Sequence, residues 1–157
     1  MTKKELGELI INSEDSFYRV ARSLLYNDAD CADAISEMIV KAFDKLYTLK
    51  NDSYAKTWLT RILITECFAI MRKEKKIVSI ETIPEGSHNP APEEFQDLYD
   101  AMERLPEKMR LSVTLYYMEG YSMKEIAKML NETELAVKTR MSRARKKLKQ
   151  DLEGEVL

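Results

Sequence analysis

Apolar residues recur at helical spacing along most of the chain, and in the first half they form three stripes that follow an i, i+3, i+4 pattern. The stripes are Phe17, Val20, Ala21, Leu24 and Leu25; Ile35, Met38, Ile39, Ala42 and Leu46; and Trp58, Leu59, Ile62, Leu63 and Ile70. The breaks between them, YNDAD and LKNDS, contain the Asn, Asp and Ser residues that favour turns and helix N-caps. This pattern predicts at least three amphipathic helices that pack against one another.

The helical spacing stops in the segment SIETIPEGSHNPAPEEF. It holds three of the four prolines, at positions 84, 90 and 92, which remove backbone donors and exclude a helix. Residues 77–100 also carry six acidic side chains and no basic one. We therefore expect an acidic, Pro-rich linker over residues 77–96.

The last third resumes the helical spacing and ends in a pattern typical of a helix-turn-helix. Ser122 and Glu125 form a capping-box pair, in which each side chain satisfies the other residue's backbone N–H. The short helix that they open is interrupted by Asn-Glu-Thr at 131–133, and a longer helix follows. The apolar positions of this region are Leu98, Met102, Leu105, Met109, Val113, Ile126, Ala127, Leu130, Val137, Met141, Ala144 and Leu148.

Positive charge is concentrated in that last helix. The stretch KTRMSRARKKLK at 138–149 holds seven basic residues, although the chain has a formal net charge of -2. Because the apolar stripe fixes one face to the domain, the opposite face presents Lys138, Thr139, Ser142 and Arg143, with Arg140, Arg145 and Lys146 at its flanks. Such a run in isolation indicates a solvated helix face. Coupled to a capped helix and a short turn, it predicts insertion into a DNA major groove.

Composition excludes several other classes of protein. The two cysteines, Cys31 and Cys67, lie far apart in apolar surroundings, so we expect buried reduced thiols and neither a zinc site nor a disulfide framework. The single histidine, His88, has no second histidine with which to hold a metal, and no cofactor is expected. The sequence has no apolar run of membrane-spanning length and its start has no signal-peptide pattern, which predicts a cytoplasmic protein without membrane insertion.

Residues 120–148, GYSMKEIAKML…AVKTRMSRARKKL, resemble region 4 of the extracytoplasmic-function (ECF) sigma factors of the sigma-70 family. The family pattern is roughly G-x-S-x-x-E-I-A-x-x-L, a turn, and G-T-V-K-S-R-L-x-R-A-R-x-x-L. The matching residues are Gly120, Ser122, Glu125, Ile126, Ala127, Leu130, Val137, Lys138, Arg140, Arg143, Ala144, Arg145 and Leu148, with Thr139 in place of serine. Leu135 and Ala136 stand where Gly-Thr is usual, which leaves the shape of the turn open.

The amino-terminal part resembles region 2 of the same family less closely. Residues 28–46 parallel A-E-D-L-V-Q-E-x-F-x-x-A-W, and residues 54–73 parallel F-x-x-W-L-x-x-I-A-x-N-x-x-x-D-x-x-R. The residues that match these two patterns are Asp33, Glu37, Ala42, Phe43, Trp58, Leu59, Ile62 and Arg72. Ala32, Ser36 and Ile39 depart from the first pattern, and Thr65 and Ala69 replace the usual Asn and Asp of the second.

The resemblance implies an all-α fold of two small helical domains joined by a flexible linker. Residues 1–76 would form a region 2 bundle, residues 77–96 the linker and residues 97–157 a four-helix region 4 domain. The implied function is that of a dissociable subunit, not an enzyme, which gives RNA polymerase its promoter specificity. The implied partners are core RNA polymerase, through its β′ coiled coil and β flap, promoter DNA, and an anti-sigma factor that binds between the domains.

The resemblance also assigns site residues. In the family, region 4 reads the −35 element, which implies DNA contacts for Lys138, Thr139, Arg140, Ser142, Arg143 and Lys146. Region 2 captures the −10 element with the loop before its third predicted helix and the exposed face of that helix, which implies Lys50, Asn51, Lys56 and Arg61. Asp33 and Glu37, four residues apart, would dock on the polymerase, or else only keep a helix face solvated. Arg72, Lys73, Lys75 and Lys76 form a second basic cluster suited to DNA-backbone contacts.

Two further interpretations stay open. Trp58 is either a core anchor or a wedge that stacks on DNA bases. The acidic linker either imitates nucleic-acid phosphates in polymerase channels or is a tether. Two other functions are disfavoured: that of a LuxR-type regulator, because residues 1–76 lack the alternating strands of a receiver domain, and that of a small helical enzyme, because no catalytic constellation is present.

Overall fold

The computed structural model describes residues 1–77 and 95–154, and every regular element in these two ranges is helical. The chain divides into two compact units, Met1–Ser87 and His88–Leu157. The predicted all-α class is therefore confirmed. Most of the predicted linker, with its three prolines and His88, lies outside the described residues, but residue 77 still belongs to a helix and a new helix begins at residue 96.

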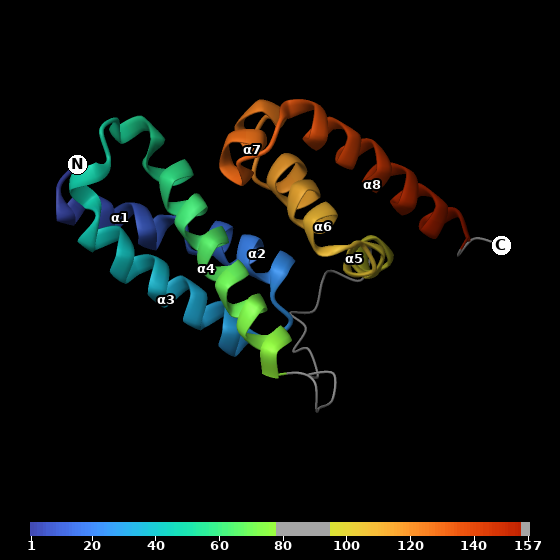
Figure 1. The fold of residues 1–157 in the computed structure, drawn as a ribbon, viewed down its shortest axis with the longest axis horizontal. Helices are drawn as coiled ribbons and strands as arrows, with labels where there is room; N and C mark the ends of the chain where they lie inside the picture. The colour runs from blue at the N-terminus through green and yellow to red at the C-terminus, as the bar shows by residue number, and fades with distance from the viewer. Residues whose placement is uncertain (78–94, 155–157) are drawn as a thin grey trace. The chain divides into compact units, whose positions relative to one another are not determined.

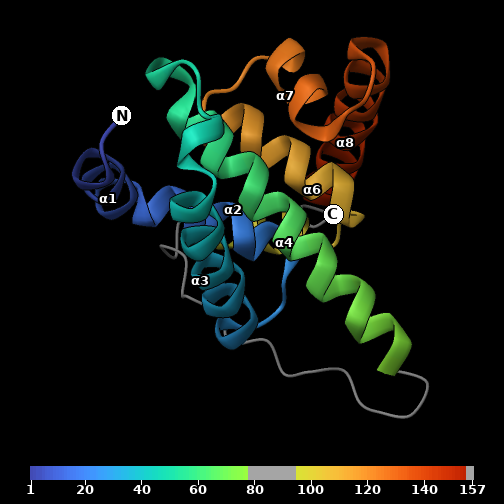
Figure 2. The same ribbon diagram turned by 60° about the vertical axis from the view of Figure 1, so that its left-hand side comes forward.

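The first unit is a helical bundle in which one long helix packs on two others. Its helices are α1 (Lys3–Asn12), α2 (Glu14–Leu24), α3 (Asp28–Asp44) and α4 (Ala55–Ile77), with short 3-10 turns η1 (Leu46–Thr48) and η2 (Asp52–Tyr54). Helix α4 lies along α3 and α2 (Figures 1 and 2). The core of this unit includes Leu6, Phe17, Val20, Leu24, Cys31, Met38, Leu59 and Leu63, each almost fully buried.

The three predicted stripes correspond to α2, α3 and α4, but α1 was not anticipated. A capping box opens it, in which the Glu5 N–H donates to Thr2 Oγ1 (3.1 Å) and the Thr2 N–H donates to Glu5 Oε1 (3.2 Å). Leu6 and Ile10 then bury one face of the helix. Only these two α1 residues are buried, which is too short a stripe to stand out by periodicity.

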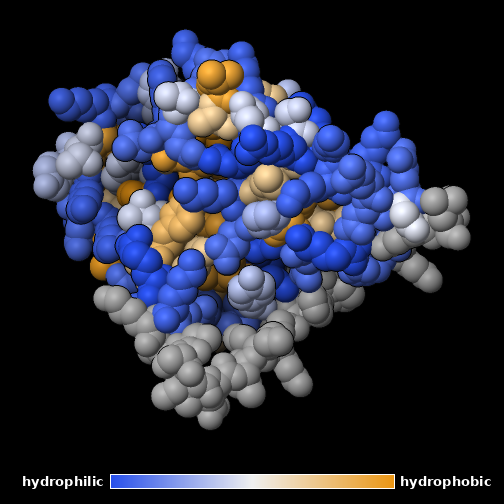
Figure 3. Space-filling model, turned by 45° about the vertical axis from the view of Figure 1, so that its right-hand side comes forward, coloured by the Kyte–Doolittle hydropathy of each residue, from blue (hydrophilic) through white to orange (hydrophobic). Residues whose placement is uncertain are grey.

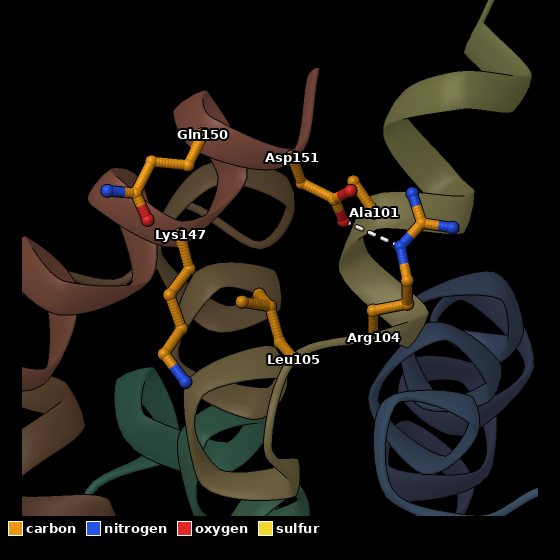
Figure 4. Close-up of a pocket in the computed structure, with 6 residues that line it drawn as sticks. All are labelled: Ala101, Arg104, Leu105, Lys147, Gln150 and Asp151. Atoms are coloured by element: carbon orange, nitrogen blue, oxygen red, sulfur yellow. Dashed lines mark hydrogen bonds and ion pairs between the residues drawn. The ribbon is translucent and has the colours of Figure 1, made fainter. Parts of the chain in front are cut away.

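The second unit packs three shorter segments against one long helix. Its elements are α5 (Gln96–Glu103), α6 (Glu107–Val113), the π-helical turn η4 (Thr114–Met118), α7 (Met123–Leu130) and α8 (Glu134–Gly154). Helix α8 contacts α5, α6 and α7 in turn (Figure 1). Near its end, Asp151 accepts a 2.6 Å ion-paired hydrogen bond from Arg104 at the C-cap of α5, beside a pocket of about 380 Å³ (Figure 4).

Arg110 is a buried cation that ties α6 to the end of α5. Its side chain is 7% exposed, and its Nη1 donates to the carbonyl oxygens of Glu103 (3.1 Å) and Leu105 (3.0 Å). Carbonyls at a helix end have no partner within the helix, so a guanidinium that reaches them stabilises the junction. The break between α5 and α6, at Leu105 and Pro106, is thus stabilised from within the next helix.

Polar side chains dominate the molecular face drawn in Figure 3, with smaller apolar patches between them.

Both cysteines are buried and free, as predicted, and burial raises the pKa of Cys31 to about 11 and that of Cys67 to about 12. Both thiols therefore stay protonated and unreactive at neutral pH. Within the described residues, no helix is long and apolar enough to cross a membrane.

Two carboxyl groups meet where the start of α3 approaches the end of α4. A hydrogen bond between Glu74 and Asp30, together with partial burial and the charge of Asp30, raises the pKa of Glu74 from 4.5 to about 7. Asp30 is held in place by Asn27, whose Nδ2 donates to its Oδ2 (3.1 Å). The folded bundle therefore binds a proton at this pair more tightly than the unfolded chain does.

This shift predicts how the stability of the bundle depends on pH. Because the folded pKa is raised, the stabilisation is fully present below about pH 4.5 and is lost as the pH rises through about 7. Glu74→Gln, which cannot ionise, should flatten the fall in melting temperature between these pH values, as measured by circular dichroism. Glu8→Gln, at an exposed position of α1, serves as the control and should keep the wild-type profile. Equal profiles for Glu74→Gln and wild type would contradict the assignment.

Candidate nucleic-acid interface

The turn between α7 and α8 has the length and capping that the sequence predicts. The Ser122 N–H donates to Glu125 Oε1 (3.0 Å) and the Glu125 N–H donates to Ser122 Oγ (3.1 Å), which confirms the capping box. Helix α7 ends at Asn131, whose φ of 55° lies in the left-handed region that Asn tolerates. Thr133 then caps α8 by accepting the Ala136 N–H at its Oγ1 (3.1 Å).

The structure explains why the turn does not need the usual Gly-Thr pair. Leu135 and Ala136 lie inside the first turn of α8, not in the connecting turn. The left-handed conformation that ends α7 is supplied by Asn131 instead, so residues 135 and 136 need no glycine. The open question about the turn is thereby answered, and the three-residue connection of a helix-turn-helix is retained.

Helix α8 has the orientation that its apolar stripe predicts. Val137, Met141 and Ala144 are 0% exposed, and Leu148 is half-buried. Five of the α8 side chains predicted to contact DNA are exposed: Lys138, Thr139, Ser142, Arg143 and Lys146. Exposure satisfies the geometric requirement for groove contact, and the contact itself stays a prediction.

Arg140 differs from these residues because its guanidinium is engaged within the protein. Its Nη1 donates to Glu132 Oε1 (2.9 Å), and its Nη2 makes a second hydrogen bond to Glu132 Oε2. Nη1 also approaches Ser112 Oγ on α6 (3.4 Å). The bond from Arg140 lowers the pKa of Glu132, so this carboxyl is ionised at neutral pH.

Arg145 forms a second internal contact that sequence reasoning missed. Its Nε donates to Tyr117 Oη (2.7 Å), and its guanidinium lies 5.8 Å and 5.7 Å from the ring centroids of Tyr116 and Tyr117. The two tyrosines belong to the π-helical turn η4, where Tyr117 is 56% exposed. Helical periodicity does not predict a π-turn, so this cluster has no signal in the sequence pattern.

A surface pocket of about 390 Å³ lies between the start of α6 and the start of α8. Its lining residues are Pro106, Lys108, Met109, Ala136, Thr139, Arg140 and Arg143. Three of the seven are cationic. The pocket therefore extends the positive surface of α8 onto α6, which suits a polyanionic partner.

In the first unit, the segment between α3 and α4 presents polar and aromatic side chains to solvent. Lys50 and Asn51 are exposed, and Asn51 caps η2 by accepting the Ser53 N–H at its Oδ1 (3.0 Å). Tyr47 is 85% exposed and Tyr54 is 62% exposed. Sequence reasoning missed these two tyrosines, although their position on either side of Lys50 was a readable signal.

The other predicted residues of this unit are distributed over α3 and α4. Lys56, Arg61, Arg72, Lys73 and Lys75 are exposed on α4, whereas the side chain of Lys76 lies outside the described ones. Asp33 and Glu37 are exposed on α3. Trp58 is half-buried. Its side chain is neither fully buried, as a core anchor would be, nor fully exposed, as a base-stacking wedge would be.

Comparisons with known proteins agree with this geometry. The family model for sigma-70, region 4, matches residues 95–148. RNA polymerase sigma factor SigV of Bacillus subtilis is 32% identical over 161 residues, which cover 99% of this chain and 96% of that protein. ECF RNA polymerase sigma factor SigM of Mycobacterium tuberculosis is 29% identical over 83% of this chain and 68% of that protein.

A solved structure has the same fold. The sigma factor RpoE of Bartonella quintana, in complex with the anti-sigma factor NepR, matches with a TM-score of 0.80 at 24% identity, covering 96% of this chain and 98% of that one. The sequence matches extend along nearly the full length of the chain, including both helical units. The chain belongs to the ECF sigma factors of the sigma-70 family, non-enzymatic subunits of RNA polymerase that direct transcription initiation.

Proposed function

We propose that this sigma factor reads the −35 promoter element with α8, captures the −10 element with the segment between α3 and α4, and docks on core RNA polymerase through α3. The domains that carry these roles are residues 1–76 and 97–157, with residues 77–96 as the linker. The observation that supports the proposal best is the division of α8 into a fully buried apolar stripe and an exposed polar and cationic face.

The exposed face of α8 has the chemistry needed for reading duplex DNA. The major groove is about 12 Å wide and admits one α-helix. Arg143 can form a bidentate contact with a guanine edge, while Thr139 and Ser142 provide short polar contacts. Lys138 and Lys146 bind phosphates and set the register of the helix, which adds affinity but no sequence information.

The −10 element is bound as an unpaired strand, and this requires stacking as well as charge. Tyr47 and Tyr54 expose their rings on either side of Lys50 and Asn51. Lys56 and Arg61, five residues apart on α4, add exposed cations on the helix that follows. Bases that stack on exposed tyrosines contribute about 1–3 kcal/mol each, so this segment can hold a melted strand.

The remaining partners follow from the family. Asp33 and Glu37 would meet cationic residues of the polymerase β′ coiled coil, and the second unit would sit on the β flap. The relative from Bartonella quintana was solved with an anti-sigma factor, and we include such an inhibitor among the partners of this chain. A subunit of RNA polymerase acts on the chromosome, so we place the protein in the cytoplasm.

The proposal is tested by adding the purified chain to core RNA polymerase. We expect co-elution in size-exclusion chromatography and initiation from cognate promoters only when both components are present. A stand-alone regulator would instead bind its operator without the core enzyme. Tight operator binding by the chain alone, with no effect on initiation by the core enzyme, would reject the proposal.

Arg143→Ala should weaken recognition of the −35 element. We expect a loss of roughly 1–3 kcal/mol at cognate elements and a relaxed base preference at one position, because a bidentate guanine contact is removed. Transcription from a panel of single-base −35 variants measures both effects. Lys149→Ala is the control: it removes an exposed cation near the end of α8 and should act equally on all promoters of the panel. An unchanged promoter ranking for Arg143→Ala would rule out the groove assignment.

Reversing the acidic pair of α3 should impair docking on the polymerase. In Asp33→Lys/Glu37→Lys, like charges would face the polymerase, which costs several kcal/mol at an interface. We expect a loss of co-elution with the core enzyme. Asp44→Lys, at an exposed acidic residue at the end of the same helix, should bind as wild type does. If the double variant binds equally well, the pair only solvates the helix.

A further inference from the structure

An acidic residue lies in the turn before the basic helix, at a place where a DNA-binding surface favours cations. Glu132 belongs to the turn between α7 and α8, and its backbone N–H donates to the Ala127 carbonyl (2.8 Å). The left-handed Asn131 before it and the capping Thr133 after it fix the backbone on both sides. The backbone of Glu132 is thus held in place by the turn itself.

This carboxylate holds Arg140 by both terminal nitrogens of the guanidinium. One hydrogen bond measures 2.9 Å, and the other joins Nη2 to Oε2. The Arg140 side chain is 15% exposed, whereas that of Lys138, two residues earlier, is 58% exposed. Each charge-assisted hydrogen bond of such a pair is about twice as strong as a neutral one, and the bidentate geometry adds specificity.

Arg140 itself also connects α8 to α6. Arg140 Nη1 approaches Ser112 Oγ on α6, and the Ser112 hydroxyl donates to the Lys108 carbonyl (2.8 Å). The ammonium of Lys108 further lowers the pKa of Glu132. Glu132 therefore offsets part of the positive charge of Lys108 and Arg140 at the edge of the DNA-facing surface.

A carboxylate and a phosphate present similar oxygen pairs to a guanidinium. We propose that the Glu132 carboxylate binds the Arg140 guanidinium and so keeps a DNA phosphate from binding there. Arg140 is then a positioning residue that fastens α8 to the turn and to α6, and Glu132 is a specificity residue that limits sequence-independent affinity for duplex DNA. This inference rests on the proposed role of α8 in the major groove.

The experiment measures binding of the full chain to a fluorescent duplex without promoter sequence, at a series of salt concentrations. Each phosphate that a protein neutralises contributes about −0.9 to the slope of log K against log salt. Glu132→Gln, which releases Arg140, should steepen the slope by about 0.9 and tighten non-specific binding. Glu132→Gln/Arg140→Gln keeps the net charge of the pair, and its slope should equal that of wild type.

Glu134→Gln is the matched control, because it removes the same charge two residues away. Glu134 pairs with Lys138 at 3.4 Å, but both side chains are about half exposed, so Lys138 is already accessible to DNA. We expect a smaller change in slope for Glu134→Gln than for Glu132→Gln. Equal steepening by the two variants would show a general charge effect and overturn the inference.

The double variant gives a second way to reject the proposal. If Arg140 contacts a phosphate in the wild-type complex, Glu132→Gln/Arg140→Gln will flatten the slope by about 0.9. Circular dichroism at each salt concentration establishes that the variants are folded. Failure of the proposed function is detected separately, as a lack of promoter-specific initiation when the chain is added to core RNA polymerase.

Discussion

Burial of three side chains on one face of α8 determines which way all the other side chains of this helix point. Val137, Met141 and Ala144 are fully buried where α8 contacts α5, α6 and α7. A helix turns by about 100° per residue, so fixing these positions also fixes the direction of every other residue on α8. A shift of the stripe by one residue toward the C-terminus would point Lys138, Ser142 and Arg145 into the core. Hydrophobic packing does not itself recognise DNA, but it therefore orients the α8 side chains that can.

The axis of α8 is set by a second constraint, the three-residue turn before it. Asn131 ends α7 in a left-handed conformation and Thr133 begins α8 with a side-chain cap. The bond from Arg140 to Glu132 joins this turn to the second turn of α8. Contacts of this kind restrict the angle between α7 and α8, and a rigid scaffold positions DNA-facing groups more accurately than a loop could.

Sequence patterns predicted the faces of helices better than they predicted individual partners. The stripes of α2, α3 and α8 and the capping box at Ser122 are local, since each depends on residues within a few positions of one another. The pair Glu132–Arg140 spans eight residues and a turn, and Arg145–Tyr117 spans 28 residues. No spacing rule specifies such pairs, because tertiary packing creates them. The short stripe of α1 and the π-turn η4 were missed because neither produces a sustained 3.6-residue period.

The internal pairs give a more exact account of the basic stretch at 138–149. Arg140 and Arg145 both make hydrogen bonds within the unit, to Glu132 and to Tyr117, and both are arginines. A planar guanidinium can satisfy a carboxylate or a phenol in a fixed geometry, which lysine does less well. Lys138, Lys146, Lys147 and Lys149 are exposed on the same helix. The density of charge in this helix therefore serves two purposes: the two arginines secure α8 to its neighbours, and exposed cations remain to attract a polyanion.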